Sequence, residues 1–127
     1  MKLLNIRQKE VNVDIRPSSF PIKVESKSKL QKLTGEKLIE KYPRTTILEE
    51  FTIPGSIMRL DFFLPNLGIV VEVSPKESHE YNSFFHGPRE SLKYAKQKER
   101  DRLKSQWCEW NNFQLIEIIT EKDLLNL

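Results

Sequence analysis

The sequence predicts an α/β domain in which helices flank a central mixed sheet of about four strands. Helix-like patterns lie before and after a block of alternating strands, which gives the order α-β-β-β-α-β. The last strand follows a long helix, and such a crossover most simply returns the chain parallel to a neighbouring strand. With 127 residues and no Gly/Ser-rich linker, we expect one domain over residues 28–127, preceded by an N-terminal arm over residues 1–27.

Apolar periodicity, turn residues and prolines place the individual elements. The arm contains the alternating stretch VNVDI and two prolines, which predicts an irregular segment with one edge strand. The elements expected after it are helix 28–42, strands 45–53, 59–64 and 69–74, helix 88–108, strand 113–119 and a short terminal helix 121–127. In the long helix the apolar stripe is expected to consist of Leu92, Ala95, Leu103 and Trp107, with Glu99 inside it.

Two carboxylates fall opposite each other in the second and third predicted strands. If residues 65–68, Pro-Asn-Leu-Gly, form the loop of a hairpin, Asp61 lies across from Glu72 on the same face. Like charges at opposed positions destabilise a strand pair, so these two acids need a shared proton or a cation. Magnesium, which binds one or two carboxylates together with phosphate and water, is the simplest solution. The alternative is an exposed hairpin face on which both acids are solvated and neutralised by Arg59.

A third acid, Glu36, is spaced by three residues from both Leu33 and Ile39, so it projects from a helix face bordered by apolar residues. Its alternative is a boundary position, paired with Lys32 or Lys37. The pattern by itself favours the boundary position.

The loop after the third strand holds both histidines of the protein, His79 and His86. Two histidines within eight residues, directly after a candidate metal site, favour a functional role for at least one of them. In the following helix, periodicity places Asp101 away from the apolar stripe, which predicts a solvated residue.

Composition narrows the functional classes. The net charge is only +3, but seven basic residues against three acidic ones occur in each of the segments 23–44 and 88–104. Such stripes are typical of nucleic-acid binding, and the alternative is a solvated lysine-rich face. The apolar runs are too short to cross a membrane, so no membrane contact is expected. A lone cysteine, Cys108, and no visible targeting signal indicate a reducing compartment, the cytoplasm.

In this order the acids and the basic helix resemble the PD-(D/E)XK nuclease superfamily over residues 28–118. The chain is similar, more narrowly, to the branch of very-short-patch repair (Vsr-like) endonucleases and of the EDxHD homing endonucleases often found in phage. The resemblance implies a restriction-endonuclease-like core and a Mg²⁺-dependent DNA endonuclease, with Mn²⁺ able to substitute, in a bacterial or phage-infected cell. It is carried by Gly35-Glu36, Arg59-Leu60-Asp61-Phe62, Glu72-Val73, His79, and Arg100-Asp101 with Lys104 followed by WNNFQLIEI.

The resemblance also implies a role for each matching residue. Asp61 is the central metal ligand, Glu72 the second acidic ligand, and Glu36 an acid that contacts the metal or its water. His79 is a general base or polarises the phosphate, and Asp101 matches the last acid of the EDxHD pattern. The expected DNA contacts are Arg59, Lys76, His86, Lys98 and Lys104.

Two positions depart from the family pattern. The family's lysine, two residues after the acid of the third strand, is Ser74 here, and Pro75 stands where the related branch usually has a glycine. Lys76 or His79 is expected to fill the lysine's role. Three alternatives stay open: a non-catalytic nucleic-acid-binding module on the same fold, a Holliday-junction-type resolvase, and an interaction protein whose charged helices are solvated. Cutting both DNA strands would require a homodimer, since one site cleaves one strand.

Overall fold

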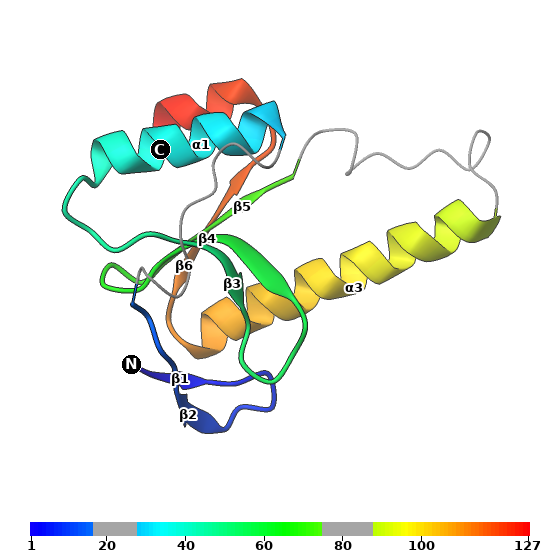
Figure 1. Ribbon diagram of the computed structural model, residues 1–127. Helices are drawn as coiled ribbons and strands as arrows, with labels where there is room; N and C mark the ends of the chain where they lie inside the picture. Colours follow the sequence, from blue (N-terminus) through cyan, green and yellow to red (C-terminus); the bar gives the residue numbers. More distant parts are fainter. Residues whose placement is uncertain (17–27, 75–87) are drawn as a thin grey trace.

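A four-stranded mixed sheet forms the centre of the protein, with the strand order β3-β4-β5-β6 (Figure 1). The structure is a computed structural model that describes residues 1–16, 28–74 and 88–127. Neighbouring strands are antiparallel from β3 to β5, whereas β6 runs parallel to β5. The strands are β3 (Leu48–Thr52), β4 (Arg59–Leu64), β5 (Ile69–Val73) and β6 (Gln114–Ile118). The predicted α/β class, the four strands and the parallel return of the last strand are confirmed.

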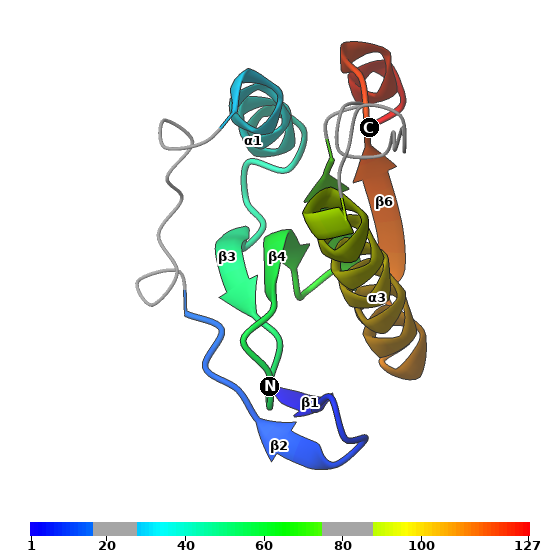
Figure 2. The same cartoon turned by 90° about the vertical axis from the view of Figure 1, so that its right-hand side faces the viewer.

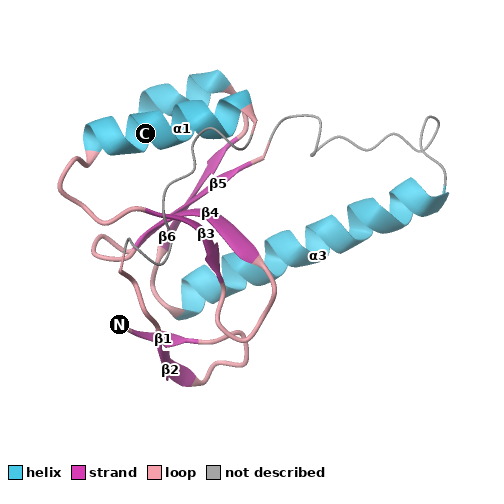
Figure 3. Ribbon diagram, in the orientation of Figure 1, coloured by secondary structure: helices cyan, strands magenta, loops and turns pink. Residues whose placement is uncertain are grey.

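Helices cover both faces of this sheet (Figures 2 and 3). The helical elements are α1 (Lys29–Lys41), α3 (Pro88–Trp110) and the 3₁₀ helix η2 (Glu121–Asn126). On one face, Leu38 of α1 packs in a cluster with Phe62 and Val71. On the other face, Trp107 of α3 packs in a second cluster with Phe63. The neighbouring residues Phe62 and Phe63 of β4 therefore enter two separate cores, as expected for a strand buried on both sides.

Helix α1 begins at the N-cap Ser28, whose hydroxyl accepts a hydrogen bond from the Gln31 amide at 3.2 Å. Its buried residues recur at helical spacing and are Gln31, Thr34, Gly35 and Leu38. The stripe predicted from Leu33, Glu36 and Ile39 is wrong, because Glu36 is exposed and Ile39 is 43% exposed. The true stripe contains polar and small residues, so apolar spacing alone did not reveal it.

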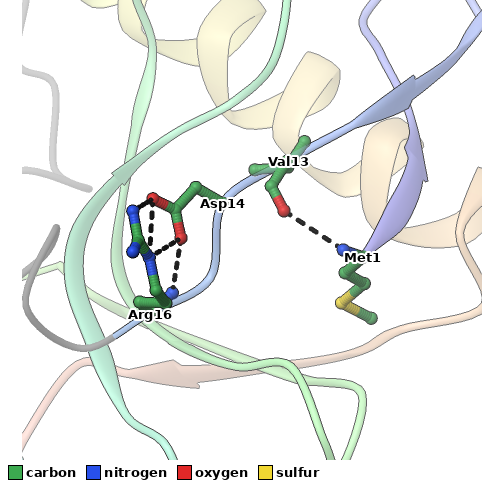
Figure 4. Close-up of polar contacts among 4 residues, drawn as sticks. All are labelled: Met1, Val13, Asp14 and Arg16. Atoms are coloured by element: carbon green, nitrogen blue, oxygen red, sulfur yellow. Dashed lines mark hydrogen bonds and ion pairs between the residues drawn. The ribbon is translucent and has the colours of Figure 1, made fainter.

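The first residues form a hairpin, whereas the sequence predicted an irregular arm with one strand in VNVDI. The strands of the hairpin are β1 (Lys2–Leu4) and β2 (Glu10–Asn12). Strand β2 overlaps the start of VNVDI, and β1 was not predicted. Beside it, the Met1 amino group donates to the Val13 carbonyl at 3.2 Å, and the Arg16 guanidinium pairs with Asp14 (Figure 4).

Contacts distant in sequence hold this hairpin on the body of the protein. The Trp107 indole donates to the Leu4 carbonyl at 2.7 Å, and the Leu4 amide donates to Asn111 Oδ1 at 2.8 Å. Leu3 is buried in the same core as Trp107. These partners lie more than 100 residues away, so no local pattern predicts the docking.

Helix α3 extends well past the end of the sheet (Figure 1). Its 23 residues span about 35 Å at 1.5 Å per residue, whereas strands of five or six residues span about 17–20 Å. Trp107 and Cys108 are buried, but Leu92 is 57% exposed and Ala95 and Glu99 are exposed. The predicted apolar stripe is therefore right only in the C-terminal part of α3. Among the described residues, no helix is long and apolar enough to span a membrane.

Candidate active site

The two opposed acids meet where the pairing of β4 with β5 ends. The register is the predicted one, with Leu64 opposite Ile69 and Phe62 opposite Val71. Beyond this last pair, hydrogen bonds from backbone amides to side-chain carboxylates take the place of hydrogen bonds between the two backbones. The Asp61 amide donates to Glu72 Oε2 at 3.1 Å, and the Val73 amide donates to Asp61 Oδ2 at 2.7 Å. Each carboxylate thus accepts a hydrogen bond from the opposite strand, and the structure brings the two predicted acids together.

The strand on the other side of Asp61 is also irregular at this level. Leu48 and Phe51 of β3 are three residues apart, yet both enter the core cluster that contains Trp107. The face changes across Glu50, which has a φ of 60°, the left-handed region that is uncommon outside glycine. Regular sheet geometry is therefore interrupted on both sides of Asp61.

A lysine from α3 contacts the acidic pair. Lys104 Nζ lies 2.7 Å from Glu72 Oε1, and the two side chains are only 19% and 11% exposed. Lys104, predicted from the sequence as a DNA contact, has its ammonium against Glu72 in the structure. Its position three residues before Trp107 was the sequence feature that could have predicted this contact, because residues three apart lie on the same side of a helix.

The acids form the floor of a pocket of about 360 Å³. The loop between β3 and β4 supplies one wall and α3 supplies another. Arg59 and Ser74 line it from the strands, and Arg100 and Asp101 line it from the helix. Asp101 is exposed, as expected from periodicity, and it also lines the pocket.

The pair holds a proton more tightly than isolated acids do. Burial and the neighbouring charge of Glu72 raise the pKa of Asp61 to about 8, while the Val73 amide and Lys104 act in the opposite direction. Without a cation, the pair therefore shares a proton at pH values where an exposed aspartate is ionised.

This proton makes the stability of the metal-free protein depend on pH. The folded-state pKa of Asp61, about 8, lies above the ordinary value of 3.8, so the folded state binds more protons between these limits. Stability is then full at low pH and falls as pH rises toward 8, by at most about 1.4 kcal/mol per pH unit. We expect urea unfolding in EDTA to show a smaller loss between pH 6 and pH 8.5 for Asp61→Asn than for the natural protein. Equal losses would contradict the shared proton.

The donor set suits a hard divalent cation. Two carboxylates in one pocket supply the oxygen ligands that Mg²⁺ prefers, and water and a phosphate complete its usual shell. Among residues 1–16, 28–74 and 88–127, no group of three or more His, Cys, Asp or Glu side chains is arranged to hold a metal. Within the described chain, the carboxylates that could hold such an ion at the pocket are those of Asp61 and Glu72.

Each remaining predicted site residue lies away from the pocket, lines the pocket, or falls outside the described residues. Glu36 is exposed on α1, which packs on the opposite face of the sheet, and it is not among the described residues that line the pocket. Arg59 is exposed at the pocket, with its Nη1 3.5 Å from Glu50 Oε2. Lys98 lies over the ring of Tyr94, 5.0 Å from its centroid, and does not line the pocket. Lys76, His79 and His86 lie outside the described residues, as does Pro75.

Three residues that line the pocket were not predicted from the sequence, namely Ile57 and Met58 of the loop before β4 and Gln97 of α3. Gln97 faces the pocket together with Arg100, Asp101 and Lys104. The intervals of three and four residues among them indicate a single helix side. The sequence prediction considered the apolar residues of this helix, so it did not include Gln97.

Comparison with known proteins gives one match to a curated protein. The chain is 36% identical over 66 residues to uncharacterized protein 033L of Invertebrate iridescent virus 3. The match covers 52% of this chain and 33% of the viral protein, so the chain spans about a third of its relative's length. No family model matches the chain, and no solved structure matches it.

Proposed function

We propose that the protein is a metal-dependent endonuclease that hydrolyses phosphodiester bonds in DNA. The observation that supports this most is the contact between Asp61 and Glu72 in an open pocket. The wall formed by α3 carries Arg100 and Lys104. Carboxylates suited to a divalent cation and cations suited to phosphate thus meet in one place.

The acids would hold Mg²⁺, with Mn²⁺ as a substitute. When bound, such an ion stabilises charge on the phosphate and lowers the pKa of water. In the reaction, water forms a new P–O bond, loses a proton to a base, and the bond to the leaving sugar oxygen breaks as that oxygen gains a proton. His79 is proposed as the base, on the strength of the family resemblance alone.

Lys104 is proposed to take the place of the family's strand lysine, since Ser74 stands at that position. Its ammonium contacts Glu72 Oε1 at 2.7 Å and brings positive charge to the pocket. It would hold the Glu72 side chain in place while a phosphate occupies the pocket. The lysine would thus come from α3 instead of from β5.

DNA is the proposed partner, and the cytoplasm the proposed location. Arg59 and Arg100 are exposed at the pocket, where they can contact the DNA backbone. Binding through such contacts weakens steeply with salt. Nicking by one chain and double-strand cleavage by a homodimer are both compatible with a single site per chain.

A plasmid assay tests the proposal. Supercoiled plasmid is incubated with the purified protein in Mg²⁺ or Mn²⁺, and we expect nicked or linear product that EDTA suppresses. An Asp61→Asn preparation, purified identically, controls for contaminating nuclease. Equal cleavage by both preparations would contradict the proposal.

One observation favours a second candidate, a non-catalytic nucleic-acid-binding module. Lys104 already neutralises Glu72 within the protein, and the strand lysine is absent at Ser74. This candidate predicts DNA binding at low salt without cleavage in any divalent metal.

A further inference from the structure

The side of α3 that packs on the sheet changes from apolar to basic residues where the sheet ends. Reading toward the N-terminus from Trp107, the residues on this side are Lys104, Arg100, Lys96 and Lys93, at intervals of three and four. Trp107 is buried and Lys104 is 19% exposed, whereas Arg100, Lys96 and Lys93 are exposed. The same stripe is thus apolar over the sheet and basic beyond it. We refer to Lys93, Lys96 and Arg100 as the basic side of α3.

The basic side runs directly into the pocket. Arg100 and Gln97, one turn from Lys96 and Lys93, line the pocket together with Asp61 and Glu72. Figure 1 shows this half of α3 lying beyond the strands, with its axis directed toward them. A polymer lying along the helix would therefore be guided to the two acids.

The opposite side of the same helix segment is different. Its charges partly cancel, because Arg102 Nε donates to Glu99 Oε2 at 3.0 Å. Ala95 lies on this side as well. The basic side thus carries three cations and no acid, whereas the opposite side carries Lys98, Arg102 and the acid Glu99.

We propose that the sugar-phosphate backbone of DNA lies along the basic side of α3 and enters the pocket at Arg100. The inference rests on the proposed function in taking DNA as the substrate. It assigns the backbone contacts to Lys93, Lys96 and Arg100 in place of Lys98. Lys98 belongs to the other side and lies over Tyr94.

The dimensions agree with several phosphate contacts. From Lys93 to Lys104 the helix rises about 16 Å, at 1.5 Å per residue. One DNA strand carries a phosphate about every 3.4 Å along the duplex axis, so this length matches about five nucleotides. Extended cationic side chains reach successive phosphates over such a span, and they set the register of the strand without reading its sequence.

The salt dependence of binding tests the inference. Binding of a short fluorescein-labelled DNA duplex is measured by anisotropy in EDTA, so that no cleavage occurs, from about 50 to 200 mM salt. Binding weakens with salt, so the slope of log K against log salt is negative, and each lost phosphate contact makes it less negative by about 0.9. We expect Lys96→Gln/Arg100→Gln to make the slope less negative by about 1.8. Glutamine is a good helix former, so the exposed helix should keep its structure, which circular dichroism verifies.

The matched control is Arg102→Gln/Lys122→Gln. It removes the same two charges from exposed positions on the opposite side of α3 and on η2. For this control the inference predicts a slope close to that of the natural protein. For the single variants, it predicts that the slope of Arg100→Gln is less negative than the slope of Arg102→Gln by about 0.9. Equal slopes for the two double variants would overturn it, because binding would then follow net charge alone.

The outcome is separable from the proposed catalysis. If the slopes differ as expected but plasmid is never cleaved, the basic side of α3 stands and the endonuclease proposal fails. If cleavage depends on Asp61 but the two double variants bind alike, the endonuclease proposal stands and this surface is wrong.

Discussion

Replacing Asp61 by asparagine should reduce Mg²⁺-dependent DNA cleavage by at least about 10²–10³-fold, the loss typical of removing one group that stabilises charge in a transition state. The asparagine side chain has nearly the same shape as aspartate, and its amide oxygen can still accept the hydrogen bond from the Val73 amide. The fold should therefore persist while the negative charge is lost. Initial rates of plasmid nicking measure the effect.

The control for this variant is Glu117→Gln. Glu117 is an exposed acid on β6, paired in register with Glu72 but outside the pocket. The Glu117→Gln variant should cleave DNA at close to the rate of the natural protein. DNA affinity in EDTA should not fall in Asp61→Asn, because the lost charge repels phosphate. If Asp61→Asn bound DNA and cleaved it at the rate of the natural protein, Asp61 would not be required for the reaction.

Replacing Lys104 by methionine should destabilise the protein by about 3 kcal/mol and also reduce cleavage. Removing one partner of a buried ion pair leaves the other charge uncompensated, at a cost of about 3–5 kcal/mol. The low end applies because the two side chains retain 19% and 11% exposure. Urea unfolding measures the loss, and Lys32→Met at an exposed position of α1 should change stability by less than about 0.5 kcal/mol.

A double variant separates the structural role of Lys104 from its proposed role in catalysis. Glu72→Gln/Lys104→Met removes both charges, so most of the lost stability should return. Cleavage should stay absent, because the site has lost one of its two carboxylates. If Lys104→Met unfolded no more easily than Lys32→Met, the ion pair with Glu72 would contribute nothing to the folded state.

The features that the sequence predicted correctly depend on local patterns. A four-residue turn and the alternation of two short strands set the register that brings Asp61 to Glu72. The parallel return of β6 followed from the length of the preceding helix. The first argument uses neighbouring residues, and the second uses the general rule for a helix that connects two strands of one sheet.

The features that it missed depend on tertiary contacts. Lys104 reaches Glu72 only because α3 crosses the strands at that level, and the side of α1 that faces the sheet is set by packing of Gln31 and Thr34. Glu36, which the family resemblance assigned to the site, lies exposed on α1. Apolar spacing cannot distinguish these cases when a buried stripe contains polar residues.

The most direct test of the central claim is a crystal structure of the protein soaked in Mn²⁺, with the ion located by its anomalous signal. We predict one or more ions bound by carboxylate oxygens of both Asp61 and Glu72, at about 2.0–2.2 Å. A crystal of protein that cleaves plasmid in Mn²⁺, but that binds the ion away from both residues, would contradict the account.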